Sequence, residues 1–130
     1  MRQQYSRNPI SRIYGYAGAA AFCVFASSVY SLYGHGVRSM HMDLAFLYPL
    51  AGGGALALAL FLKPAIVGGK FFRLGANLYN SGLAALAVGS FLQGVMDIAG
   101  TASKYIIWFF VSGACMVAAA IPAILFFKND

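Results

Sequence analysis

The sequence predicts an all-α integral membrane protein with four transmembrane helices arranged as two helical hairpins. Of its 130 residues, 61% are hydrophobic and only 9% are charged, whereas a soluble domain has about 25% charged residues. The apolar residues also form four runs, and each is close to the roughly 20 residues that a membrane-spanning helix needs. We interpret residues 1–130 as a single four-span domain with spans at 13–33, 44–62, 78–97 and 105–127.

The first run, 13–33, follows a basic segment, as the apolar region of a signal peptide does. Its 21 residues exceed the usual length of such a region, so we expect it to be retained as the first membrane helix. Every fourth residue from Gly15 to Ser31 is small. Small residues at this spacing let membrane helices pack closely.

The second run, 44–62, has no charged residue, yet it contains Pro49 and the glycines Gly52, Gly53 and Gly54. Proline lacks the N–H that would bond the carbonyl four residues back, and glycine weakens a helix in water. Two interpretations remain open. The glycines allow another helix to approach closely, or they and Pro49 break the span, as in the discontinuous helices that line transporter binding sites.

The third run, 78–97, carries the polar residues Ser90, Gln93 and Asp97 on one helix face. An ionisable residue within a membrane is a candidate functional residue. Near the membrane surface, however, Asp97 is hydrated or caps the turn that follows. Both the functional and the structural interpretation stay open.

Other residues in this run, and Asn77 just before it, have expected capping or packing roles. Asn77 is placed to cap the start of the helix. Asn80 is expected to bond across helices or to contact a polar substrate. Gly89 belongs to a stripe of small and polar residues at every fourth position, which favours close helix crossings.

The distribution of Lys and Arg predicts the orientation. Short loops rich in these residues stay in the cytoplasm, and seven basic residues fall on one side of the membrane against two on the other, namely Arg2, Arg7, Arg12, Lys63, Lys70, Arg73 and Lys128 against Arg38 and Lys104. Both termini are therefore predicted to be cytoplasmic, and the compact loops indicate a bacterial cytoplasmic (inner) membrane. Lys63, Lys70 and Arg73 are expected to contact anionic headgroups or a cytoplasmic partner.

Both histidines of the chain, His35 and His41, lie in the loop before the second span, together with Arg38 and Asp43. With Asp97 they are candidates for a metal site or a pH-sensitive cluster. The histidine spacing is not that of a helical ligand pair. His35 also fits a turn between two glycines, and Asp43 fits a helix cap. We therefore predict no metal site, with His35 and His41 as weak candidates, and no cofactor.

Several function classes are disfavoured. No span contains His, which disfavours a haem-bearing electron carrier. Neither a Ser–His–Asp nor an HExxH pattern is found, so we predict that the protein is not an enzyme. Cys23 and Cys115 lie far apart in apolar runs and are expected to be free thiols. The net charge of +6 sits at the ends of the spans, which favours contact with the lipid bilayer over nucleic acid.

Three functions remain. The first is an oligomeric channel or transporter protomer, with Asp97, Gln93, Asn80 and Ser90 as candidates for a path between protomers or between hairpins. The second is a non-catalytic accessory or scaffold subunit of a larger membrane complex, and the third is a metal- or haem-binding membrane protein. Small-residue stripes on several spans indicate partners within the bilayer, either copies of the chain in a homo-oligomer or another membrane subunit.

Overall fold

The computed structural model describes residues 9–63 and 71–125, and all regular elements in these two ranges are helices. Four stretches of the described chain are long and apolar enough to cross a membrane, and α2 and α3 together form one of them. The prediction of an all-helical chain with four helices of spanning length is therefore confirmed. The helices are α1 (Pro9–Tyr33), α2 (Met40–Asp43), α3 (Leu47–Leu62), α4 (Phe72–Ala99) and α5 (Ile107–Leu125).

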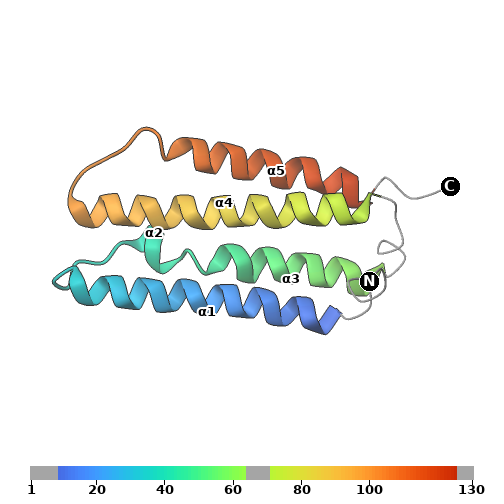
Figure 1. Cartoon of the computed structure of the whole chain (residues 1–130), viewed down its shortest axis with the longest axis horizontal. Coiled ribbons are helices and arrows are strands. Elements are labelled where there is room, and N and C mark those ends of the chain that lie inside the picture. The colour runs from blue at the N-terminus through green and yellow to red at the C-terminus, as the bar shows by residue number, and fades with distance from the viewer. Residues whose placement is uncertain (1–8, 64–70, 126–130) are drawn as a thin grey trace.

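Figure 1 shows the four long helices side by side in the order α1, α3, α4, α5, and each packs against the next. One hairpin consists of α1 and α3, and the other of α4 and α5. The start of α1 and the end of α5 lie at one end of the molecule, which we call the Arg12 end. The connections 34–46 and 100–106 lie at the opposite end, which we call the Asp97 end.

The most extensive helix contact is between α4 and α5, and it includes glycines of α4 spaced seven residues apart. A Cβ atom added at Gly82 would lie 2.8 Å from the carbonyl oxygen of Gly113 and 2.9 Å from the backbone nitrogen of Val117. Added Cβ atoms at Gly75 and Gly89 would also lie 2.8 Å from atoms of α5. A seven-residue spacing keeps one face of a helix toward its neighbour, so α5 follows these glycines along α4. The predicted stripe at every fourth residue includes Gly89 but neither of the other two.

A hydrophobic cluster at the Arg12 end joins the two hairpins. It combines residues of α3, α4 and α5, and Tyr16 of α1 packs against it. Buried members of the cluster are Leu56, Leu60, Phe72, Ala76, Tyr79, Leu83, Ala120 and Ile124.

The second span is interrupted before Pro49 rather than at the glycines. Pro49 is the third residue of α3, and a first helical turn tolerates proline because its N–H would have no helical partner there. The carbonyl of Ala45, which residue 49 would normally bond, accepts instead from the N–H of Tyr48 at 3.3 Å. The helix that we predicted from residue 44 therefore begins at Leu47, and a turn separates it from α2.

The three glycines of α3 remain helical, and two of them face neighbouring helices. A Cβ at Gly53 would lie 2.2 Å from the Tyr16 ring on α1, and one at Gly52 would lie 2.4 Å from the Leu83 side chain on α4. The Tyr79 hydroxyl donates a hydrogen bond of 2.7 Å to the Gly52 carbonyl. Gly52 and Gly53 thus let α3 fit closely between α1 and α4, as the close-packing interpretation requires.

Two predicted helix caps are wrong. Helix α4 begins at Phe72, so Asn77 lies inside the helix, and no side chain caps its start. The helix begins early because Phe72 and Ala76 are each only 2% exposed within the core. Asp43 is the last residue of α2, while the residue before α3 is Phe46, again without a side-chain cap.

Gly82→Ala tests the contact between α4 and α5. Because the added methyl group meets backbone atoms, we expect the free energy of unfolding to fall by about 1–3 kcal/mol. The matched control is Gly54→Ala, since a Cβ at Gly54 has no atom within 4 Å. Alanine is the better helix former, so this control should be neutral or slightly stabilising. Unfolding in mixed micelles, followed by circular dichroism, measures both, and equal effects would contradict the packing.

Candidate functional site

Polar side chains gather around Asp97 at the Asp97 end. The Asp97 carboxylate accepts hydrogen bonds from Ser39 Oγ at 2.7 Å and from Gln93 Nε2 at 2.9 Å. His41 Nδ1 also lies 2.9 Å from it. Because Ser39 and His41 belong to the connection between α1 and α3, these bonds fasten that connection to α4.

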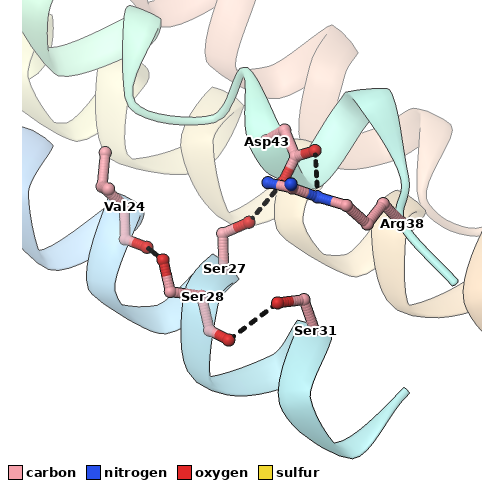
Figure 2. Close-up of polar contacts among 6 residues, drawn as sticks. All are labelled: Val24, Ser27, Ser28, Ser31, Arg38 and Asp43. Carbon is pink, nitrogen blue, oxygen red and sulfur yellow. Dashed lines mark hydrogen bonds and ion pairs between the residues drawn. The ribbon is translucent and has the colours of Figure 1, made fainter. Parts of the chain in front are cut away.

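A second carboxylate, Asp43, fastens the same connection to α1. Figure 2 shows Ser27 of α1 pointing at Asp43, and its hydroxyl donates a bond of 2.7 Å. Arg38 approaches from the other side, with Nε 3.2 Å from the carboxylate. Ser28 and Ser31 instead donate to carbonyls of α1 itself, the usual way in which hydroxyls are satisfied within a helix.

The backbone of α2 is held as well. Ser90 Oγ on α4 donates a hydrogen bond of 2.6 Å to the His41 carbonyl. Met42 is 2% exposed, and it lies so close to Gly94 that an added Cβ there would be 2.5 Å from the Met42 Cβ. We call the whole set the polar clamp, whose members are Ser27, Arg38, Ser39, His41, Asp43, Ser90, Gln93 and Asp97.

Hydrogen bonds of the clamp join the connection between α1 and α3 to both α1 and α4. Among residues 9–63 and 71–125, no buried side-chain nitrogen or oxygen lacks a hydrogen-bond partner. Such complete pairing is what polar groups in or near a bilayer require. Of the three polar residues that the sequence places on one face of this helix, Ser90 and Asp97 bond residues of the connection. Gln93 instead donates to Asp97 on the same helix.

The two histidines are not brought together as metal ligands. His35 has a positive φ of 53° and lies exposed in the turn between Gly34 and Gly36, while His41 is paired with Asp97. Within the described part of the chain, no three of the residue types His, Cys, Asp and Glu gather as a metal site would require.

A groove of about 740 Å³ lies between α1 and α4, and Pro49 of α3 contributes to its lining. Its walls come from different hairpins. Small residues on both helices leave this space, and a Cβ at Gly15 would meet no atom within 4 Å. The lining residues are Arg12, Gly15, Tyr16, Ala19, Phe22, Cys23, Ala26, Pro49, Ala76, Asn80, Leu83, Ala84, Ala87, Val88, Phe91 and Leu92.

Polar groups of the groove are concentrated near the Arg12 end. The Arg12 guanidinium lies over the ring of Phe72, 5.0 Å from its centroid, a cation–π contact. Four residues further along α1, the Tyr16 hydroxyl donates a hydrogen bond to Asn80 Oδ1 on α4. Beyond this bond the lining of both walls is apolar or small.

The candidates from the sequence are thus divided between two places. Asn80 lines the groove, whereas Ser90, Gln93 and Asp97 belong to the clamp. The small residues from Gly15 to Cys23 line the groove instead of contacting a helix, which periodicity alone does not reveal.

Two further candidates lie away from both places. Lys63 directly follows α3, and Arg73 is in the first turn of α4, both exposed at the Arg12 end. Lys70 lies outside the described residues.

Comparison with protein-family models, with curated proteins and with solved structures found no match in any of the three.

Asp97→Ala tests the clamp. The substitution leaves Ser39, which is 4% exposed, without its acceptor, so we expect the free energy of unfolding to fall. Amide hydrogen exchange at Asp43 and Leu44 should also accelerate, because α2 loses its attachment to α4. Asp97→Asn keeps one oxygen acceptor and should have a smaller effect.

Ser112→Ala is the control, because Ser112 is exposed on α5 and bonds a carbonyl of its own helix. Equal exchange in the Asp97→Ala and Ser112→Ala proteins would show that the clamp does not hold α2.

Proposed function

We propose that the chain is a protomer of a transport protein in a bacterial cytoplasmic membrane, with both termini cytoplasmic and the transport path between its two hairpins. The observation that carries this proposal is the groove of about 740 Å³ between α1 and α4. Its volume falls in the range of about 300–1,000 Å³ typical of ligand sites.

The position of the groove supports transport because its two walls belong to different hairpins. Many transporters alternate access by moving one helix bundle against another around a site at their interface. Here the hairpins meet where α2 and α3 contact α4, and a shift of α1 and α3 relative to α4 and α5 would change the width of the groove.

The lining favours an apolar or amphipathic cargo over an ion. Ion paths are lined by carbonyl oxygens, charged rings or water, whereas most of this groove is lined by Ala, Leu, Val and Phe. The proposed path therefore runs through the groove, which Asn80 lines, and not past Gln93 and Asp97. It also includes assembly with further copies of the chain or with another membrane subunit.

The basic residues at the Arg12 end support the proposed orientation. Arg12, Lys63 and Arg73 lie at this end among the described residues, while Arg38 and Lys104 lie at the other. A cytoplasmic leaflet rich in anionic lipids attracts basic residues.

A second candidate is a non-catalytic accessory or scaffold subunit. The polar clamp favours it, because Asp43 and Asp97, the two carboxylates within residues 9–63 and 71–125, both hold the connection between helices. A subunit of this kind would need the fold but not an open groove.

Ala84→Phe separates the two candidates, because a phenyl group at Ala84 projects from a lining position and fills the groove. In vesicles containing purified protein, we expect the wild-type chain to move fluorescent lipids between leaflets faster than protein-free vesicles do. Ala84→Phe should reduce this rate to near the protein-free level.

Ala118→Phe is the matched control, since Ala118 is exposed on α5 and is not a lining residue, and it should leave the rate unchanged. If the wild-type protein moves neither neutral nor anionic lipids, single-chain or double-chain, the transport proposal fails and the subunit interpretation replaces it.

A further inference from the structure

The polarity of the groove changes along its length in the order found in a phospholipid. On α1, Arg12 is followed by Tyr16 and then by Ala19, Cys23 and Ala26. Each step is three or four residues, which keeps these positions on one face of the helix. A cationic group, a polar hydroxyl and an apolar stretch thus follow one another from the Arg12 end inward.

The opposite wall has a matching order. On α4, Asn80 bonds Tyr16, and the lining continues through Leu83, Ala84, Ala87 and Phe91. The Asn80 amide carries N–H donors as well as the oxygen that accepts from Tyr16. Polar groups of both walls are therefore at the same depth, one helical turn inside Arg12.

We propose that the groove binds an anionic phospholipid, with its phosphate at Arg12, its ester groups near Tyr16 and Asn80, and one acyl chain along the apolar part. The claim that this lipid is the transported cargo rests on the proposed function. The claim that the groove binds this lipid rests only on the geometry of the groove.

The length of the groove suits an acyl chain. The lining on α1 runs from Arg12 to Ala26, about 21 Å at roughly 1.5 Å per residue. The lining on α4 runs from Ala76 to Leu92, about 24 Å by the same rise. An acyl chain occupies one leaflet, about half of the roughly 30 Å of the hydrocarbon core, so a groove of this length holds one acyl chain together with the ester region next to it.

Arg12 supplies the charge that selects an anionic headgroup. Its guanidinium lies over the Phe72 ring, which holds it at the mouth of the groove. Guanidinium groups stack through their faces and donate N–H groups in their plane to phosphate oxygens. A helix from a second copy of the chain would fit the apolar walls, but an apolar helix does not reproduce the order of a cationic group, polar groups and an apolar stretch along the groove.

Native mass spectrometry of the full chain in detergent tests the binding site. The probes are phosphatidylglycerol and phosphatidylcholine with identical acyl chains, added in equal amounts. We expect one phosphatidylglycerol to be retained per protomer in preference to phosphatidylcholine. Arg12→Gln should reduce this preference roughly tenfold, the effect of losing about one charge-assisted hydrogen bond.

Lys104→Gln removes the same charge at the Asp97 end and should leave the preference unchanged. Ala84→Phe should abolish retention of both lipids, whereas Ala118→Phe should not. Circular dichroism and thermal unfolding establish that each variant is folded before its lipid content is compared.

The inference is overturned if phosphatidylcholine is retained equally well, or if Arg12→Gln and Lys104→Gln have equal effects. A dimer that Ala84→Phe disrupts, without retained lipid, also overturns it and identifies a second copy as the occupant. Retention without lipid movement in vesicles supports the binding site and refutes transport. Lipid movement that does not depend on headgroup charge or on Arg12 supports transport and refutes this inference.

Discussion

Close contact between helix backbones is the constraint on which this structure depends. Lipid tails are as apolar as leucine, so apolar helices in a bilayer gain little by hiding from solvent and instead associate through packing at short range. In this chain glycine permits that range, at Gly82 and Gly113 between α4 and α5 and at Gly52 and Gly53 around α3. Two helices pack closely wherever a side chain or the backbone of one helix occupies the space beside a glycine of the other.

The groove arises where small residues have no such neighbour. Gly15 and Ala19 on α1 resemble the glycines of α4 in size, but no helix fills the space in front of them. At the Asp97 end, the polar clamp joins the two walls of the groove indirectly, because it binds the connection that contains α2 to α1 through Asp43 and to α4 through Asp97. One kind of residue thus builds the helix contacts, and the same kind leaves the space that we propose to be functional.

The sequence predicts which segments form membrane-spanning helices, but it does not predict which helices lie next to one another. Hydropathy and length predict each span, because they depend on local composition alone. The presence of Pro49 predicts a possible break in the second span, because proline disrupts a helix. The position of the turn, before Pro49, depends on the packing of the surrounding side chains and does not follow from the sequence pattern. Helical spacing predicts that Asp97 shares a face with Ser90 and Gln93. Its partners Ser39 and His41 cannot be predicted in this way, because they lie in a connection without periodicity. The groove depends on which helices are adjacent, and no pattern within α1 or α4 contains that information.

The most direct test of a lipid-binding groove between the hairpins is solution NMR in nanodiscs of deuterated lipid containing one protonated phosphatidylglycerol per protomer. Nuclear Overhauser effects from the protonated acyl chain should be concentrated on the methyl groups of Ala19, Ala84 and Ala87, and should be weak at Ala118, which faces away from the groove on α5. Equal effects at all four alanines, or direct contacts between Ala19 and Ala84 that close the groove, would contradict the account.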